Sequence, residues 1–304
     1  MAETVGFIGL GVMGKPMATN LVTHGYPLIV RDVNPRPVDE LVRLGAEKGA
    51  SAREVAAGSS IIITMLFNDA TTREVVLGQD GLMEGFRPGS VHIDMSTLLP
   101  MNAVRFAEEA EKREGHFLSA PVARGPMGAR EGTLTIMAGG RKEVFERCLP
   151  LLQVMGKKIF HVGEQPEMGH VFKLTNNLLS AVHGAIAAEA MALGVKGGAD
   201  PEKLYEVITE GSGNSYIFGL HVPNMLEGNK EVLTLAIKGI YKDLENVNSF
   251  AKHLRLPAPF AALGQQKYLE GIAAGKGDKD RSALVELFES LHDIAVRRDT
   301  VRGE

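Results

Sequence analysis

Short apolar runs alternate with helix-forming segments along the first half of the chain. The runs that we interpret as β-strands are rich in Val, Ile and Leu and are bounded by turn residues; they span 5–10, 27–30, 61–66, 91–95, 117–122, 134–138 and 159–162. Helical patterns lie between them, and one begins with a capping box formed by Ser51 and Glu54. Strand alternating with helix predicts an α/β domain over residues 1–164, with a doubly wound, mostly parallel sheet covered on both faces.

The pattern changes near residue 165. Strand-like runs disappear, and patterns of helical period that are rich in Ala, Leu, Glu and Lys follow. One of them, from about 168 to 197, has no internal proline and exceeds the ~8 to 20 residues usual for a helix of a globular protein. We therefore expect an all-helical second domain over residues 165–304, joined to the first domain by this long helix.

Composition describes an ordinary globular protein of 304 residues, with 33 basic and 37 acidic side chains, a formal net charge of −4 and a pI near 6.2. Because Lys and Arg form no run, we expect no nucleic-acid partner. The single cysteine, Cys148, has no partner for an intramolecular disulfide, which fits a reducing compartment. The chain starts without a signal-peptide pattern, and His183 and Glu189 interrupt its most apolar stretch, so we expect a cytoplasmic protein without a membrane span.

A glycine-rich turn follows the first apolar run directly. It consists of Gly9, Leu10, Gly11, Val12, Met13 and Gly14. In the GxGxxG spacing one glycine permits a tight bend, one lets the backbone approach a diphosphate, and one lets helix and strand pack closely. The diphosphate then lies at the helix N-terminus, where backbone N–H groups point at it. With a strand before it and a helix after it, this turn predicts a Rossmann-type dinucleotide site rather than a merely structural bend.

Asp32 ends the second apolar run, where a dinucleotide site places an acidic residue. A carboxylate there accepts hydrogen bonds from ribose hydroxyls and repels a 2′-phosphate, which favours NAD(H) over NADP(H). Val33, and not a cation, follows the acid, and Asn34 continues the turn. Arg31 and Arg36 lie near enough to offset part of the repulsion. The alternative is that Asp32 is a solvated turn residue.

On the predicted long helix, Gly169, Lys173, Asn176 and Asn177 are three or four residues apart and share one face. Asparagine is unfavourable within a helix, so a pair beside a lysine indicates a polar lining. A desolvated lysine, with its pKa lowered toward ~7 to 8, can take a proton from an alcohol or give one to a carbonyl oxygen. The alternative is a solvated helix face.

Other polar groups are weaker candidates. Lys242 suits the neighbourhood of a cofactor, although by itself it reads as a surface residue. Ser212 and Ser215 form a small polar loop, which suits either a substrate contact or an ordinary connection between helices. The histidines are scattered without the spacing of metal ligands, so we predict no metal.

These motifs together resemble the β-hydroxyacid dehydrogenases, the family of 3-hydroxyisobutyrate dehydrogenase and tartronate semialdehyde reductase. The segments that carry the likeness follow the family's order over nearly the whole chain; they are 6–21, 94–97, 120–122, 132–140, 169–177 and 242–244. The resemblance implies a Rossmann domain, a long joining helix and a helical domain for substrate and assembly, in a homodimer or homotetramer. It also implies hydride exchange between NAD and a small hydroxy acid or its semialdehyde.

The resemblance assigns roles by position. It makes Lys173 the catalytic acid/base and Asn177, with Asn176 beside it, a substrate ligand. The cofactor contacts that it implies are Met65 and Leu66 on the adenosine side, Ser96 and Thr97 on the nicotinamide side, and Lys242.

One segment departs from the family pattern. Where the family has a serine and a glycine after Ala-Pro-Val, this chain has Ala123 and Arg124, followed by Gly125. A guanidinium binds a carboxylate, phosphate or sulfonate through two parallel hydrogen bonds, each roughly twice as strong as a neutral one. Arg124, Asn177 and the backbone amides from Val122 to Gly125 are then expected to hold a substrate more anionic or more extended than 3-hydroxyisobutyrate. The alternative has Arg124 turned to solvent.

We therefore expect an NAD-dependent dehydrogenase or reductase that interconverts a small anionic β-hydroxy acid and its semialdehyde. Two alternatives stay open. An arginine at position 124 is similar to the sulfolactaldehyde reductase branch, which reduces a sulfonated aldehyde to 2,3-dihydroxypropanesulfonate, although Gly125-Pro126-Met127 matches that branch poorly. A non-catalytic dinucleotide-sensing protein would also keep the glycine turn, but it would not need Lys173.

Overall fold

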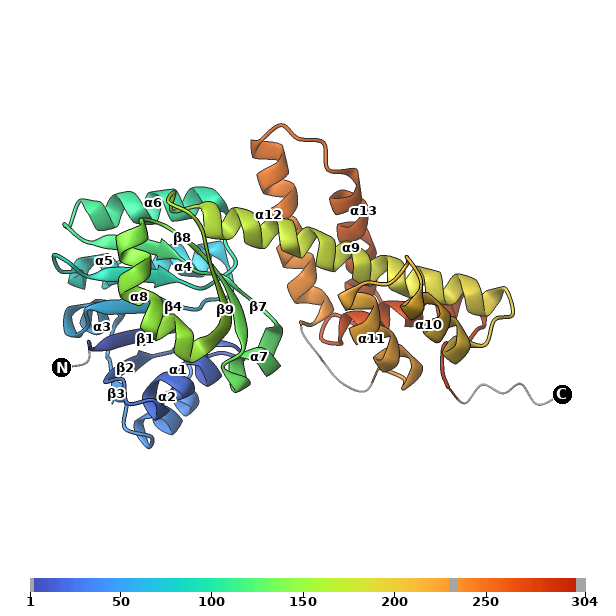
Figure 1. Cartoon of the computed structure of the whole chain (residues 1–304), viewed down its shortest axis with the longest axis horizontal. Coiled ribbons are helices and arrows are strands. Elements are labelled where there is room, and N and C mark those ends of the chain that lie inside the picture. The colour runs from blue at the N-terminus through green and yellow to red at the C-terminus, as the bar shows by residue number, and fades with distance from the viewer. Residues whose placement is uncertain (1–2, 230–234, 299–304) are drawn as a thin grey trace. The chain divides into compact units, whose positions relative to one another are not determined.

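The computed structural model describes residues 3–229 and 235–298. It divides into two compact units, Met1–Leu174 and Thr175–Glu304. In the described residues, the first unit carries a nine-stranded sheet with helices packed on it, and the second consists of helices (Figure 1).

The sheet of the first unit is doubly wound and mostly parallel, which confirms the predicted fold class. Its strands are β1 (Val5–Ile8), β2 (Leu28–Arg31), β3 (Glu47–Lys48), β4 (Ile61–Thr64), β5 (Val91–Asp94), β6 (His116–Ser119), β7 (Val122–Ala123), β8 (Leu134–Gly139) and β9 (Gly156–Gly163). They pair in the order β3-β2-β1-β4-β5-β6-β8-β7, and β9 pairs with β8. Neighbours from β3 to β6 are parallel, whereas β8 is antiparallel to both β6 and β7.

Helices cover both faces of this sheet. One hydrophobic core lies under α1 (Gly14–Thr23), α2 (Pro35–Val42), α7 (Gly125–Glu131) and α8 (Lys142–Met155), and the other under α3 (Ala52–Gly58), α4 (Asp69–Leu77), α5 (Leu82–Gly85) and α6 (Pro100–Glu111). Ile61 and Ile63 of β4 belong to the first core and Ile62 to the second. This alternation explains why the central strands are apolar at every position, since both of their faces are buried.

Two short strands differ from the expected pattern. Strand β3 consists of the exposed pair Glu47 and Lys48, which carries no apolar signal. The run predicted at 117–122 is divided between β6 and β7, because Pro121 has no N–H to donate to a ladder. Both differences lie where pairing with a neighbouring strand, and not a local pattern, defines the strand.

The long helix predicted at 168–197 is present as α9 (Met168–Lys196). The boundary between the units falls within it, at 174/175, beyond the predicted boundary at 164/165. The remaining helices are α10 (Pro201–Glu210), α11 (Tyr216–Leu226), α12 (Ile237–His253), α13 (Pro259–Ala273), the 3-10 helix η1 (Arg281–Leu284) and α14 (Val285–His292). Buried polar contacts attach α13 and η1 to α9: the Tyr268 hydroxyl donates to the Ala181 carbonyl at 2.9 Å, and Arg281 Nη1 donates to the Ser180 carbonyl at 2.7 Å.

By length and composition alone, α9 meets the criterion for a helix that crosses a membrane, with a mean hydropathy of 1.6 over its most apolar window. His183 and Glu189 therefore do not exclude a span, although the sequence-based expectation used them for that purpose. Long core helices of soluble proteins meet the same criterion, and 39% of this window is buried within the protein.

Candidate active site

The carboxyl ends of the parallel strands form one edge of the sheet, and their last residues lie in one row. In register across the edge are Arg31, Ile8, Thr64, Asp94 and Ser119. The direction of chain progression reverses at β1, which lies between β2 and β4. In open α/β sheets, ligands bind outside the carboxyl ends at such a switch point. The turns that follow β1, β2, β4 and β5 are therefore the candidate ligand contacts.

The glycine turn after β1 has no room for a side chain at two of its positions and has room at a third. Gly9 has φ +98°, and a Cβ built there would lie 2.3 Å from the Met65 carbonyl oxygen. A Cβ at Gly14 would lie 1.9 Å from the Gly9 carbonyl oxygen, whereas a Cβ at Gly11 meets nothing within 4 Å. No side chain caps the N-terminus of α1. The turn thus leaves open space in front of the helix N-terminus, which fits a diphosphate.

Asp32 is anchored beside this turn. Its Oδ2 accepts a hydrogen bond from the Leu10 N–H at 2.6 Å, and its Oδ1 accepts one from the Asn34 N–H at 2.7 Å. Val33 is 95% exposed, and its role as a cofactor contact stays a prediction. The carboxylate therefore links the turn after β1 to the turn after β2, which fits a ribose ligand better than a solvated turn residue.

Lys15 of α1 and Arg36 of α2 share one acidic partner. Glu40 of α2 forms ion pairs with Lys15 and with Arg36, whose Nε lies 3.3 Å from Glu40 Oε1. The hydrogen bond from Lys15 is the main cause of a lowered pKa at Glu40. Glu40 therefore offsets part of the positive charge that would otherwise attract a 2′-phosphate.

The predicted contacts after β4 and β5 are joined to each other. The Leu66 N–H donates to Ser96 Oγ at 2.9 Å, and the Met65 N–H donates to the Ile8 carbonyl at 2.9 Å. Thr97, the next residue after Ser96, is half-buried. The structure thus brings these residues and the glycine turn to the same edge of the sheet.

The first turn of α9 lies directly on the sheet. A Cβ at Gly139 would lie 2.5 Å from the Gly169 nitrogen, and a Cβ at Gly169 would lie 2.6 Å from the Met137 carbonyl oxygen. Backbone therefore meets backbone at this contact, with no room for a side chain. Lys173 follows Gly169 by one helical turn and is only 9% exposed. A solvated lysine is excluded for the described structure, while a catalytic role for Lys173 stays a prediction.

In the helical unit, Asn177 and Lys242 meet at a residue that the sequence reasoning did not single out. Asn177 Nδ2 donates to Asp243 Oδ2 at 2.8 Å, and Lys242 Nζ forms an ion pair with Asp243 Oδ1 at 2.9 Å. Asn176 is exposed, with its Nδ2 3.4 Å from Asn177 Oδ1. Of the two asparagines predicted to line a site, Asn177 is thus buried and Asn176 is exposed, and their role in binding substrate stays a prediction. The signal that could have revealed Asp243 is its place directly after Lys242.

The turn between β7 and α7 carries the departure from the family pattern. Arg124 is exposed and has φ +86°, a left-handed conformation that glycine adopts without strain. Val122 is buried. Ala123 and Gly125, the residues on either side of Arg124, are half-buried. A role for the Arg124 side chain in binding substrate stays a prediction.

The loop with Ser212 connects α10 to α11 and is exposed. Ser215 caps α11, because its Oγ accepts the Phe218 N–H at 3.0 Å. The structure thus accounts for Ser215 as a helix cap, and a substrate contact at Ser212 stays a prediction.

Comparison with known proteins supports both halves of the chain. Residues 4–163 match the model for the NAD binding domain of 6-phosphogluconate dehydrogenase, and residues 168–288 match the model for the NAD-binding domain of NADP-dependent 3-hydroxyisobutyrate dehydrogenase. The 2-(hydroxymethyl)glutarate dehydrogenase of Eubacterium barkeri is 36% identical over 96% of this chain and 97% of its own length. The 2-hydroxy-3-oxopropionate reductase of Escherichia coli K12 is 37% identical over 96% and 99%.

A solved structure agrees with these relatives. The 3-hydroxyisobutyrate dehydrogenase of Mycobacterium tuberculosis, solved with L-serine, has a TM-score of 0.87 and 29% identity, covering 94% of this chain and 99% of that one. The chain belongs to the β-hydroxyacid dehydrogenase family. It is an oxidoreductase with an NAD-binding Rossmann domain, and the open glycine turn and the anchored Asp32 fit that cofactor.

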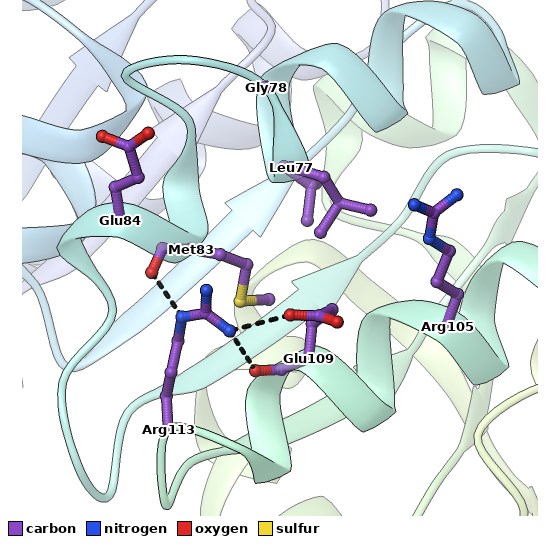
Figure 2. A pocket seen from close by; sticks show the side chains of 8 residues that line it. Leu77, Gly78, Met83, Glu84, Arg105, Glu109 and Arg113 are labelled. Carbon is purple, nitrogen blue, oxygen red and sulfur yellow. Dashed lines mark hydrogen bonds and ion pairs between the residues drawn. The ribbon is translucent and has the colours of Figure 1, made fainter.

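A cavity of about 300 Å³ lies elsewhere in the Rossmann unit of this dehydrogenase, between α4, α5 and α6 (Figure 2). Arg113 spans it, donating from Nε to the Met83 carbonyl at 2.7 Å and from Nη1 to Glu109 Oε2 at 2.9 Å. Its lining contains none of the predicted site residues. We therefore do not assign the dehydrogenase reaction to this cavity.

The prediction that this dehydrogenase binds no metal is one that the structure does not test. Over residues 3–229 and 235–298, no three His, Cys, Asp or Glu side chains are grouped so that they could hold a metal ion.

Proposed function

We propose that this protein interconverts a small anionic β-hydroxy acid and its semialdehyde with NAD as the hydride carrier, and that Lys173 is the general acid/base. The single observation that carries this proposal is the burial of Lys173 one turn beyond Gly169, where α9 rests on the sheet edge that also carries the glycine turn. A buried amine has less stabilisation of its charged form than a solvated one, and so exchanges a proton more readily near neutral pH.

NAD supplies the hydride acceptor for oxidation and, in its reduced form, the donor for reduction. The residues that would hold it are the backbone of the glycine turn and Asp32. During oxidation Lys173 takes the proton of the substrate hydroxyl, and during reduction it returns a proton to the carbonyl oxygen. Asn177 lies one turn further along α9, and its bond to Asp243 restrains the rotation of its amide.

A preference for NAD over NADP rests on Asp32. Its two oxygens accept backbone hydrogen bonds at 2.6 and 2.7 Å, which fixes a negative charge where a 2′-phosphate would lie. The ion pairs of Glu40 with Lys15 and Arg36 support the same preference, because they offset the nearby cations.

For the substrate, we assign Arg124 to a second anionic group. Its left-handed backbone conformation and exposed side chain support this assignment, since glycine would fit the turn with less strain. The relative from Eubacterium barkeri is named for 2-(hydroxymethyl)glutarate, which has two carboxylates. A dicarboxylate therefore comes first among the candidates, and a sulfonated aldehyde such as sulfolactaldehyde comes second.

The decisive experiment follows NADH absorbance with 3-hydroxyisobutyrate, 2-(hydroxymethyl)glutarate and 2,3-dihydroxypropanesulfonate. We expect the dianion 2-(hydroxymethyl)glutarate to have the highest kcat/KM, with the sulfonate 2,3-dihydroxypropanesulfonate second. In Lys173→Ala, kcat should fall on the order of 10²- to 10⁴-fold, with the Kd for NAD little altered.

Lys173→Arg is the matched control, because it keeps the positive charge but does not release a proton at neutral pH. It should be as inactive as Lys173→Ala. Full turnover in either variant would exclude Lys173 as the acid/base.

We further propose that the protein is a cytoplasmic homodimer or homotetramer. Leu179, Ile186 and Leu193 of α9 recur every seven residues and are 56%, 54% and 75% exposed, a spacing at which helices pair side by side. Light scattering of Ile186→Glu should give a smaller assembly than the native protein. The cytoplasmic location is supported by the absence of a second cysteine in the sequence.

A further inference from the structure

A fully buried group of polar side chains lies inside the Rossmann unit at the carboxyl end of β5. Its members, which we call the β5 cluster, are each 0% exposed: Thr64, His92, Asp94, Ser96 and His170. Burial of polar groups is costly unless they are paired, so a cluster of this size needs an explanation. The residues come from β4, β5, the turn after β5 and the first turn of α9.

Asp94 is the centre of this cluster. Its Oδ2 accepts hydrogen bonds from Thr64 Oγ1 at 2.6 Å and Ser96 Oγ at 3.1 Å, and its Oδ1 accepts one from the Ser96 N–H at 3.1 Å. Ser96 Oγ in turn accepts the Leu66 N–H at 2.9 Å. The carboxyl group therefore fixes the turn after β5, and through Ser96 it ties that turn to the turn after β4.

His170 fills the space between this carboxyl group and α9. Its Nε2 lies 3.8 Å from Asp94 Oδ1, and neither ring nitrogen has a hydrogen-bond partner among the described residues. Burial lowers the pKa of His170 to about 3, so the ring is neutral. The side chain thus acts here by its volume. It belongs to the same helical turn as Gly169 and precedes Lys173 by three residues.

Asp94 titrates near neutral pH, whereas the two histidines of the β5 cluster do not. Burial raises the pKa of Asp94 to about 7, although the hydrogen bonds from Thr64 and Ser96 oppose the shift and the charge of Asp69 adds to it. The other titratable neighbour, His92, is neutral because burial lowers its pKa to about 3. On α9, the cationic residue nearest to His170 in sequence is Lys173.

The direction of the dinucleotide follows from the sheet. Asp32 follows β2, on one side of the glycine turn, and marks the adenosine end. The other end of an extended dinucleotide must then lie over the carboxyl ends of β4 and β5, where the β5 cluster is buried beneath the turn.

We propose that Asp94 and His170 are positioning residues for the reaction: Asp94 fixes the turn that meets the nicotinamide, and His170 holds the first turn of the helix that carries Lys173 against the sheet. This proposal rests on the proposed function, because it takes Lys173 as the acid/base. It has a consequence for binding: an ionised Asp94 favours the cationic oxidised nicotinamide over the neutral reduced one.

The first test needs only binding measurements. In the native protein, the ratio of the Kd for NADH to the Kd for NAD⁺ should rise about three- to tenfold between pH 6 and 8, as the buried carboxyl group ionises. In Asp94→Asn, which keeps the size of the side chain, this rise should be reduced to less than half, with any remainder due to Lys173. A flat ratio in the native protein, or an unchanged slope in Asp94→Asn, would overturn the proposal.

Ser96→Ala keeps the proposal testable if Asp94→Asn does not fold. It removes one donor that favours the ionised carboxyl group, so the midpoint of the pH slope should move to higher pH. An unmoved midpoint would show that the slope belongs to another group.

A second buried histidine–aspartate pair provides the matched control. In the helical unit, His221 Nδ1 lies 2.8 Å from Asp280 Oδ1, and both side chains are buried. Asp280→Asn should lower stability without altering the pH slope of the NADH-to-NAD⁺ ratio. An equal loss of slope in this control would mean that general loosening, and not Asp94, causes the effect.

The positioning role of His170 is tested with variants that differ in the volume of the side chain. We expect His170→Ala to lower kcat about tenfold or more with KM and the Kd for NAD⁺ within about twofold, because a small misplacement of a catalytic group is costly. His170→Leu, of similar volume, should restore most of kcat. A folded His170→Ala variant with native kcat would contradict the positioning role.

These outcomes are separate from those of the proposed function. Lys173→Ala should retain the part of the pH slope that depends on Asp94, since that part needs neither turnover nor the lysine. If Lys173→Ala turns over normally while the slope depends on Asp94, the acid/base assignment fails and the carboxyl group keeps its role.

Discussion

Two turns at the sheet differ in how they use the backbone. The glycine turn after β1 has glycine at Gly9, where φ is +98°, and at Gly14, where a Cβ would lie 1.9 Å from a carbonyl oxygen. The turn after β7 has a comparable left-handed conformation at Arg124, where φ is +86°, yet it carries a long charged side chain. In the first turn glycine occupies the left-handed position, as steric rules predict. In the second turn a residue with a long side chain occupies it.

The difference fits the two roles proposed for these turns. A turn that must admit a diphosphate has few solutions, and glycine is the residue that provides them. If the turn at Arg124 binds substrate as proposed, its strain of about 1 kcal/mol is offset by a charge-assisted contact of the side chain. We therefore expect substitutions in the two turns to affect different steps.

The largest effect should come from Gly14→Ala. The added methyl group has no room, so we expect a loss of stability of about 3 kcal/mol and a Kd for NAD raised at least about 100-fold. Gly11→Ala is the control, since nothing lies within 4 Å of its Cβ. It should keep the native unfolding midpoint and weaken only NAD binding. Equal stability of the two variants would show that the turn is looser than described.

A change at Asp32 should have the next largest effect. In Asp32→Ser we expect kcat/KM with NAD to fall about 10- to 100-fold, and the preference for NAD over NADP to narrow, because the charge that repels a 2′-phosphate is gone. Steady-state rates with both cofactors provide the measurement. If Asp32→Ser keeps the full preference for NAD over NADP, residues other than Asp32 discriminate between the two cofactors.

At Arg124, two variants separate strain from charge. Arg124→Gly relieves the left-handed strain and should raise stability by up to about 1 kcal/mol, whereas Arg124→Ala keeps the strain and should not. Both should raise KM for the dianionic substrate about 10- to 100-fold, because both lose the guanidinium. The free energy of unfolding and KM are measured together. If KM is unchanged in both variants, Arg124 does not bind substrate.

The last prediction concerns buried titratable groups, which the cofactor side contains at His92, Asp94 and His170, and its effect over one pH unit is small. The two histidines, with pKa values of about 3, resist protons that the unfolded chain takes up below pH 6.5, so stability falls as pH falls. Asp94, with a pKa of about 7, acts in the opposite direction, because the folded state keeps a proton that the unfolded chain releases.

The net contribution of these three groups is a loss of about 1.4 kcal/mol per pH unit between pH 6.5 and about 4, equivalent to one proton, and the lowered pKa values of His116 and His221 add to the loss. In Asp94→Asn the opposing contribution disappears, and the slope should approach that of two protons. Denaturant unfolding at several pH values provides the test. A stability that does not fall below pH 6.5 would show that the histidines are accessible to protons.

Much of the fold could be predicted from sequence because its signals are local. Apolar runs and helical periods predicted the doubly wound sheet and α9, and the glycine turn predicted the NAD site. Strand β3 and the antiparallel placement of β8 were not predicted, since both depend on pairing between distant segments. The family and the class of enzyme followed from motifs that span the chain.

The candidate site was harder to predict for the same reason. The bond from Asn177 to Asp243 joins residues 66 positions apart, and no periodicity indicates it. Nothing in the sequence around His170 indicates that its ring lies 3.8 Å from Asp94. Burial and distance between remote residues, which a sequence does not display, decide these contacts.

The contact of Gly139 with Gly169 has an evolutionary consequence. The start of α9 is located by the lack of atoms between two backbone segments, so a side chain at either glycine has no room unless the helix moves away from the sheet. We expect neither position to accept a larger residue, and the place of Lys173, one turn later, to be fixed for the same reason. If Lys173 is the acid/base as proposed, new substrates would be acquired by changing loops such as the one around Arg124, while the proton-transfer geometry stays the same.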